Sequence, residues 1–119
     1  MHRLAPDKYG LDLPDRRRVP LDKDGYLRNL DDWSADVAEA LAAREDITLT
    51  PAHWEVITLV RQFHQAFGLS PATRPLVKYV ALHLGEGKGK SIYLMKLFGG
   101  KPALTISRLG GLPRPANCF

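Results

Sequence analysis

The chain has 119 residues, of which 45% are hydrophobic and 25% are charged, with a formal net charge of +4 and a single cysteine. This length and composition predict one soluble globular domain and exclude a disordered or collagen-like chain. A lone cysteine excludes an internal disulfide framework. The sequence has no run of about 18 apolar residues, so no membrane-spanning helix is expected. Because the N-terminus also lacks the apolar stretch of a secretory signal, we expect a cytoplasmic, reducing environment.

The N-terminal part of the chain is predicted to form a loose extension followed by a small β-hairpin. Residues 1–15 show no sustained hydrophobic period and contain two prolines and a glycine, which is typical of an unstructured extension. Two short extended runs, 17–21 and 26–28, flank an Asp-Gly turn within residues 22–25. Because Pro20 cannot donate to a strand ladder, we expect an edge strand or a two-stranded ribbon that helices cover.

Five helices are predicted in the remainder of the chain, separated by short loops. Thr50-Pro51 and Ser70-Pro71 each combine a capping residue with a proline suited to the first helical turn, and glycines stand at the expected ends. The expected helices cover about residues 32–44, 51–67, 71–84, 90–98 and 102–109. Apolar residues at helical spacing predict the buried faces, namely Val56, Leu59, Val60, Phe63, Phe67, Leu76, Val77, Val80, Ala81, Leu84, Leu94, Met95, Phe98, Ala103, Ile106 and Leu109. The pattern favours a small, mostly α-helical bundle.

Positive charge is concentrated near the C-terminus. Residues 84–119 carry six Lys and Arg side chains and only one acid, Glu86. Two interpretations remain open, because such a segment either creates a local positive field for a partner or is an ordinary solvated helix face.

The last nine residues, 111–119, are predicted to form an extended arm. Pro113 and Pro115 fix their own backbone and bias their neighbours toward extended geometry, so the arm cannot prolong the preceding helix. In a polyproline-like conformation its last eight residues would reach roughly 25 Å. Gly110 and Gly111 would supply a pivot at its base.

Cys118, the only thiol of the protein, lies next to the end of this arm. A thiol on a proline-stiffened terminus is expected to be accessible, and Arg114, Arg108 and Lys101 are candidates for favouring its ionisation or for docking a partner. Without a second cysteine, a sulfur atom bound there must pass to another molecule. The sequence pattern alone leaves open a second interpretation, a chance cysteine in a frayed tail.

The tail sequence 111–119 resembles the C-terminus of the DsrC/TusE family of sulfur-carrier proteins. The similarity covers about residues 17–119 and rests on the segments 24–27, 33–34, 49–56, 70–74, 76–78 and 99–103. It implies a β-hairpin on an orthogonal bundle of helices. The expected organisation is therefore an extension over 1–15, a helical domain over 16–110 and an arm over 111–119 carrying Cys118.

The resemblance also implies a function for Cys118, namely accepting sulfur as a persulfide and delivering it to another protein. Family members with two cysteines have the second one eleven residues earlier, where this chain has Ser107. This difference favours a one-cysteine, TusE-like relay, a sulfurtransferase acting by stoichiometric persulfide transfer. Sulfur would pass from a TusBCD/DsrEFH-like donor complex to an enzyme making 2-thiouridine in tRNA. The alternative is a one-cysteine carrier in sulfur oxidation or sulfite reduction, with a sulfite-reductase-like acceptor. No cofactor is implied, and we expect a monomer when the protein is free.

Other residues suggest different uses. The segment 63–84 resembles a helix-turn-helix whose second helix carries Arg74 and Lys78, although few side chains suited to reading bases make direct nucleic-acid binding a weaker hypothesis. Arg74 and Lys78 are also candidates for a partner-docking patch, a pocket for the terminal carboxylate or plain solvent-facing charge. His53 and His64 would lie about 16 Å apart along one helix, so no metal site is expected. His53 is predicted to serve in capping or packing.

Overall fold

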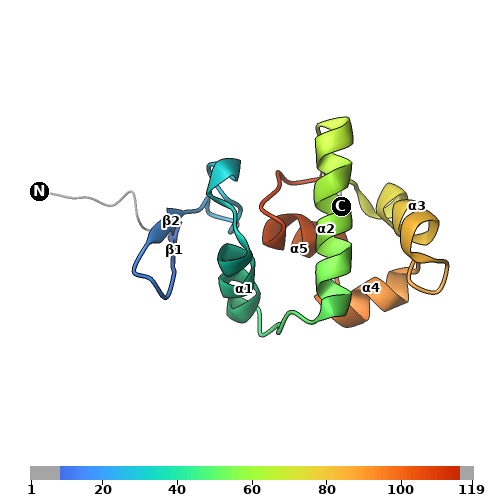
Figure 1. Ribbon diagram of the computed structural model, residues 1–119, viewed down its shortest axis with the longest axis horizontal. Helices are drawn as coiled ribbons and strands as arrows, with labels where there is room; N and C mark the ends of the chain where they lie inside the picture. Colours follow the sequence, from blue (N-terminus) through green and yellow to red (C-terminus); the bar gives the residue numbers. More distant parts are fainter. Residues whose placement is uncertain (1–8, 116–119) are drawn as a thin grey trace, which may run out of the picture.

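A computed structural model describes residues 9–115 of the chain as a small helical fold with a β-hairpin at one end. The elements are β1 (Gly10–Asp12), β2 (Arg18–Pro20), the 3-10 helix η2 (Leu30–Asp32), α1 (Ala35–Arg44), α2 (Pro51–Phe67), α3 (Thr73–Leu84), α4 (Ser91–Phe98) and α5 (Pro102–Leu109). The hairpin and α1 form one end, α2 crosses the middle, and α3 and α4 form the other end (Figure 1). The predicted fold class, five helices with an N-terminal hairpin, is confirmed.

Capping residues fix the starts of the first two helices, at Ala35 rather than about residue 32 for α1 and at Pro51, as the sequence predicts, for α2. The Ser34 hydroxyl accepts a hydrogen bond from the Val37 amide at 3.3 Å at the start of α1. At the start of α2, Nδ1 of His53 accepts from the Thr50 amide at 3.1 Å, and Nε2 of His53 donates to the Leu97 carbonyl at 2.8 Å. The capping role predicted for His53 is confirmed, and the same ring joins α2 to the end of α4.

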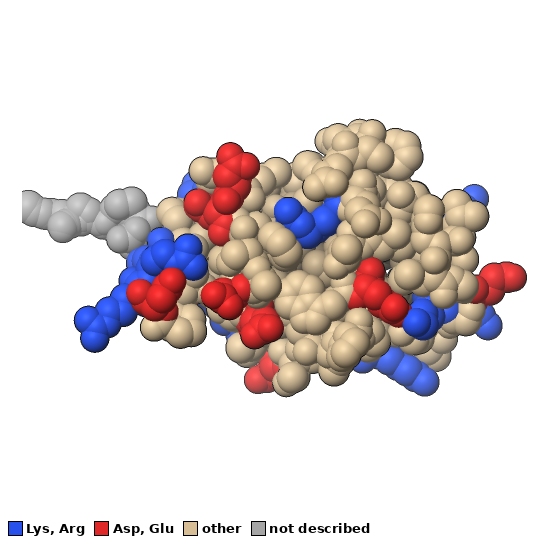
Figure 2. All heavy atoms as spheres, in the orientation of Figure 1, with Lys and Arg blue, Asp and Glu red and all other residues tan. Residues whose placement is uncertain are grey.

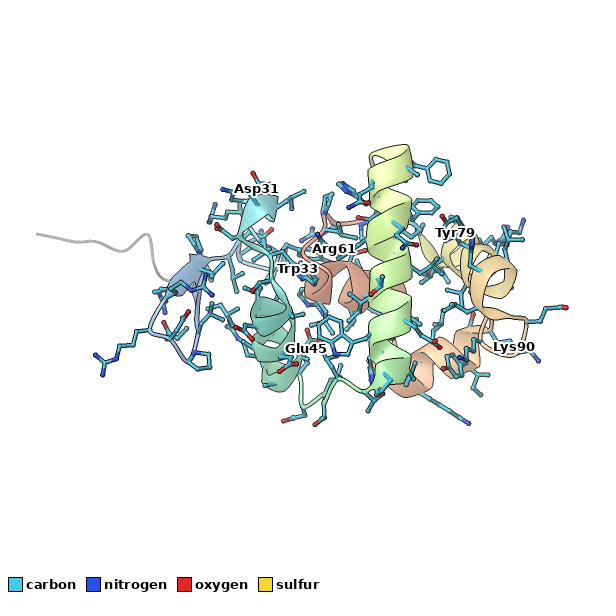
Figure 3. The ribbon with its side chains drawn as sticks, viewed as in Figure 1. Asp31, Trp33, Glu45, Arg61, Tyr79 and Lys90 are labelled. Carbon is cyan, nitrogen blue, oxygen red and sulfur yellow. The ribbon has the colours of Figure 1, made fainter. Side chains whose placement is uncertain are left out.

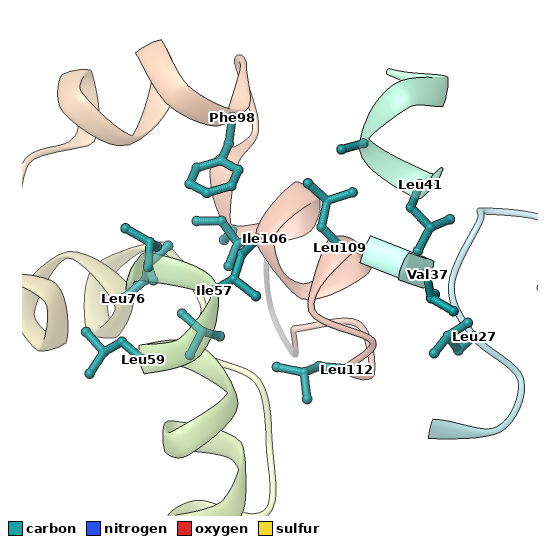
Figure 4. Packing of buried hydrophobic residues seen from close by; sticks show 14 of the residues in the cluster. Leu27, Val37, Leu41, Ile57, Leu59, Leu76, Phe98, Ile106, Leu109 and Leu112 are labelled. Carbon is teal, nitrogen blue, oxygen red and sulfur yellow. The ribbon is translucent and has the colours of Figure 1, made fainter. Parts of the chain in front are cut away.

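Helix α5 is the centre of the fold. It contacts α1, α2, α3 and α4, and six of its eight residues are buried. Ile106 lies among core residues of α2, α3 and α4, including Ile57, whereas Leu109 faces Leu41 of α1 (Figure 4). Because α5 is packed on several sides, the chain that follows it starts from a rigid position.

The hairpin forms from different residues than the sequence predicts. Strand β1 lies inside the segment 1–15 that was expected to be a loose extension, and it pairs with β2 in the register Leu11 to Val19. The predicted pairing across the Asp-Gly turn is reduced to a single bridge between Leu21 and Leu27. Burial explains the difference, because Leu11 and Leu13, and then Val19 and Leu21, enter the core at alternate positions over runs too short to give a clear periodic signal.

Two further expectations are corrected at helix ends. Helix α3 begins at Thr73 rather than at Pro71, because Ser70 does not cap it and donates its hydroxyl elsewhere. Phe67 and Met95, predicted to face the core, are 58% and 44% exposed. Phe67 is the last residue of α2 and extends beyond the layer that α5 covers, so its position on the apolar face of the helix does not bury it.

Candidate functional site

The C-terminal tail stays on the body of the domain as far as the structure describes it. After α5 the chain continues through Gly111, Leu112 and Pro115, all of which are buried. Cys118 lies outside the described residues. The first five residues of the predicted arm, 111–115, thus lie against the domain, and Gly111 is buried there rather than free to act as a pivot.

Trp33 and Arg61 hold the point where α5 ends and the tail begins (Figure 3). The Trp33 indole N–H donates to the Leu109 carbonyl at 2.9 Å, and Nη1 of Arg61 donates to the Gly110 carbonyl at 2.6 Å. The guanidinium of Arg61 also lies over the Trp33 ring, 3.7 Å from its centroid, and burial lowers the pKa of Arg61. A cation is thus placed at the negative end of α5, where its carbonyls lack helical partners.

Gly111 is required at its position by both backbone and packing. Its φ is +69°, in the left-handed region, and a Cβ built there would lie 2.3 Å from Cδ1 of Trp33. The backbone of Gly111 is therefore packed directly on the Trp33 ring, which fixes the direction in which the tail leaves α5.

The next two residues are held by the core and by the link between α2 and α3. The side chain of Leu112 is 3% exposed, and its amide donates to the Ser107 carbonyl at 2.9 Å. The Ser70 hydroxyl donates to the Pro113 carbonyl at 2.6 Å. Because proline carries no N–H, this carbonyl is the one polar backbone group that Pro113 offers for fixing the tail.

Arg114 pairs with Asp24 in the turn after β2. Its Nη2 donates to Oδ2 of Asp24, and its guanidinium lies over the Tyr26 ring, 5.0 Å from the centroid. The hydrogen bond from Arg114 lowers the pKa of Asp24, and the reciprocal bond raises the pKa of Arg114. We call Trp33, Arg61, Ser70, Asp24 and Tyr26 the tail anchor, since together they hold residues 110–114.

Arg108 also lies beside Tyr26, where it joins α5 to the end of α1. Its Nε and Nη2 donate to the two carboxylate oxygens of Glu45 at 2.9 and 3.0 Å, and its guanidinium is 5.5 Å from the Tyr26 ring centroid. Burial alone would lower the pKa of Arg108, but the hydrogen bond and charge of Glu45 outweigh burial and raise it. The structure thus places two predicted site residues, Arg108 and Arg114, against one tyrosine. Their influence on Cys118 stays a prediction.

The other predicted site residues lie elsewhere. Arg74 and Lys78 are exposed on α3. Lys101 is the exposed residue before α5 and lines a hollow of about 160 Å³ together with Met95 and Pro102. One hypothesis places the terminal carboxylate in a pocket formed by Arg74 and Lys78. The C-terminal residue lies outside the described residues, so this hypothesis stays a prediction.

The side chain of Ser107, on α5, is buried. Its hydroxyl has no hydrogen-bond partner among the described residues. An unpaired buried hydroxyl costs free energy, so this position tolerates a serine rather than depending on it for stability.

Sequence reasoning missed the residues that hold the tail. Trp33, Asp24 and Ser70 stand in segments that carried the family resemblance, but no local pattern relates them to residues 109–114, which lie 43 to 90 positions away. Arg61 had no signal beyond being a charged residue in a helix.

Neither a metal cluster nor a membrane span is found in the part of the chain that the structure covers. Among residues 9–115 no three His, Cys, Asp or Glu side chains lie close enough together to hold a metal ion. No helix in the same range is sufficiently long and apolar to cross a bilayer.

The fold and the tail anchor define the class of this protein, a hairpin-plus-five-helix domain whose C-terminal tail is fixed to its last helix. Residues 14–119 match the family model described as DsrC like protein, and the chain belongs to that family.

Curated relatives agree with this assignment. The chain is 52% identical over 101 residues to a protein of Haemophilus influenzae named Sulfurtransferase TusE homolog, a match covering 85% of this chain and 93% of the relative. It is 49% identical over 103 residues to Sulfurtransferase TusE of Yersinia pseudotuberculosis, covering 87% and 95%.

Solved structures share the fold. The NMR structure of Allochromatium vinosum DsrC superposes with a TM-score of 0.81 at 38% identity, covering 92% of this chain and 99% of that one. The crystal structure of the oxidized gamma-subunit of the dissimilatory sulfite reductase, DsrC, from Archaeoglobus fulgidus gives 0.79 at 33% identity, with the same coverage.

Proposed function

We propose that this protein is a one-cysteine, TusE-like sulfur carrier that accepts a persulfide on Cys118 and hands the sulfur to an acceptor protein. The observation that carries the proposal is the tail anchor, which fixes the chain up to Arg114 on the rigid end of α5, only four residues before the sole thiol. Relatives 52% and 49% identical are named for sulfurtransferase TusE, which supports this reading.

The transfer step needs one thiolate and one donor persulfide. The Cys118 thiolate attacks the outer sulfur of the donor persulfide, the donor's sulfur–sulfur bond breaks, and the donor cysteine leaves as a thiolate. The proton of the persulfide stays on the transferred sulfur, so atoms and electrons balance without an added oxidant or reductant. Delivery to the acceptor repeats this exchange in the opposite sense.

Ser107 supports the one-cysteine form of the relay. A serine hydroxyl cannot form a sulfur–sulfur bond, so within this chain the sulfur on Cys118 has no thiol with which to form a disulfide. We propose that a TusBCD-like complex in the cytoplasm donates the sulfur and that a tRNA-thiolating enzyme accepts it, as the resemblance to the DsrC/TusE family implies.

Intact-mass spectrometry tests this function. The full chain is incubated with a cysteine desulfurase, cysteine and the TusBCD-like donor, and we expect wild type to gain about 32 Da, the mass of one sulfur atom, in a form that dithiothreitol removes. Cys118→Ser should gain nothing, and the matched variant Ser107→Ala should load like wild type. A wild-type chain that stays unmodified with excess loaded donor would contradict the proposal.

A further inference from the structure

Charge is divided unevenly between the two halves of the described sequence. Residues 9–55 carry eleven acids and six Lys and Arg, whereas residues 56–115 carry nine Lys and Arg and one acid, Glu86. No acid at all occurs between Glu55 and Glu86, a stretch that includes most of α2 and all of α3. Figure 2 shows acidic side chains mainly over the half that contains the hairpin and α1.

Large apolar side chains are exposed in the same acid-free stretch. Besides Phe67, the side chains of Leu69 and Leu82 are 51% and 77% exposed. The Phe67 ring packs 4.6 Å from Phe63 and 6.5 Å from Tyr79, so the exposed ring is part of an ordered aromatic group between α2 and α3. Large apolar side chains exposed beside an ordered aromatic group are typical of a place where another molecule binds.

The outward face of α3 adds two cations to this apolar surface. Arg74, Lys78 and Leu82 are spaced four residues apart, which puts them in one row along the helix, and all three are exposed. Within the described part of the chain neither Arg74 nor Lys78 forms an ion pair. Their charges are therefore available to a partner.

This surface lies next to the place where the tail is held. Ser70, whose hydroxyl donates to the Pro113 carbonyl, directly follows Leu69 in the link between α2 and α3. Cys118 is only three positions after Pro115, and three residues of extended chain span about 10 Å. A protein that meets the thiol must therefore approach close to this link.

We propose that this surface, the α3 face formed by Phe67, Leu69, Arg74, Lys78, Tyr79 and Leu82, docks the sulfur-donor protein through an acidic surface surrounding an apolar patch. The inference rests on the proposed function and names the partner surface that it requires. Complementary charge speeds the encounter and orients the two proteins, while the apolar groups supply burial.

The donor fits this face better than the acceptor or a nucleic acid does. An acceptor that modifies tRNA needs a positive surface for its polyanionic substrate, and such a surface would repel Arg74 and Lys78. Two cations beside exposed leucines offer few phosphate contacts, whereas an apolar centre with charged edges is typical of protein interfaces.

Loading kinetics with two sulfur sources test the proposal. The first source is the persulfide-loaded TusBCD-like complex, and the second is inorganic polysulfide, which needs no docking. The variants are Arg74→Glu with Lys78→Glu, and Leu82→Ser. The matched control, Lys90→Glu with Lys96→Glu, makes the same change in net charge at exposed positions around α4.

We expect the double reversal on α3 to lower the second-order rate of loading from the protein donor by about tenfold at low salt, with the difference shrinking as salt is raised. Leu82→Ser should lower this rate about threefold at every salt concentration, because the variant loses buried apolar contact with the donor and not a charge interaction. All variants should load from polysulfide at the wild-type rate.

Three results would overturn the docking proposal. One is equal loading from the protein donor by the α3 double variant and the α4 control. Another is tRNA that blocks loading of wild type but not of the α3 double variant, since the face would then bind nucleic acid. The third is a rate of loading from polysulfide that falls in the α3 variants as much as their rate of loading from the protein donor does. If wild type loads from neither source, the proposed function itself fails, so the two failures are distinguishable.

Discussion

The tail anchor and the α3 face differ in where their polar and apolar groups find partners. In the anchor, Trp33, Arg61 and Ser70 each donate to a backbone carbonyl of the same chain. On the α3 face, the exposed Arg74 and Lys78 form no ion pair with any residue that the structure describes, and exposed leucines and an aromatic ring belong to the same face. The anchor is thus built to position a segment of this protein, whereas the groups of the α3 face have no ion-pair partner within residues 9–115. Variants in the first should change stability, and variants in the second should change association.

The largest stability effect is expected at Gly111. Gly111 and Gly68 have nearly the same positive φ, +69° and +74°, but a Cβ at Gly68 meets nothing within 4 Å, whereas one at Gly111 meets the Trp33 ring. Gly68→Ala should cost about 1 kcal/mol of unfolding free energy for its backbone alone, and Gly111→Ala about 2 kcal/mol more for the clash. Urea denaturation with unchanged m-values measures both. Equal costs would show that the tail is not packed on Trp33.

A matched pair of leucines gives the next largest contrast. Leu112 is buried beside α5, whereas Leu82 projects from α3 into solvent. Leu112→Ala should lower the free energy of unfolding by about 2 to 3 kcal/mol through lost burial and a residual cavity, and Leu82→Ala should change it by about 0.5 kcal/mol or less. Denaturant melts of the two variants compare them directly. If Leu112→Ala lowered the free energy of unfolding by only as much as Leu82→Ala does, the tail would contribute little to the core.

The smallest effect is expected at the exposed Asp24–Arg114 pair. Because Arg114 holds the pKa of Asp24 below 3.8, the pair is complete above that pH and is lost as pH falls through the lower, folded value. The Arg114 Nε–H resonance in a nuclear magnetic resonance titration should therefore stay constant from pH 7 to about 4.5 and shift only below 3.8. Asp24→Asn should remove this shift. A transition near neutral pH would assign the effect to another group.

Prediction from sequence succeeded where short-range chemistry decides structure. Helix α2 starts at Pro51 and ends at Phe67 as expected, because a threonine cap, a proline and a C-terminal glycine act within a few residues of each other. Prediction failed for β1, whose buried run is too short to give a periodic signal, and for the start of α3, where the deciding contact comes from a distant segment. Ser70 has the composition of a helix cap, yet its hydroxyl is used by a carbonyl 43 residues away.

The amino-acid sequence by itself determined the five helices, the central apolar face of α5 and the single thiol beside the C-terminus, because periodicity, capping and composition are local properties. Only the tertiary structure decided that residues 110–114 are held on Trp33, Arg61, Ser70 and Asp24, and that Phe67, Leu69 and Leu82 of the acid-free stretch are exposed. The physical reason is that hydrogen bonds and packing between residues 43 to 90 positions apart depend on how the helices pack against each other. No local sequence pattern specifies that packing.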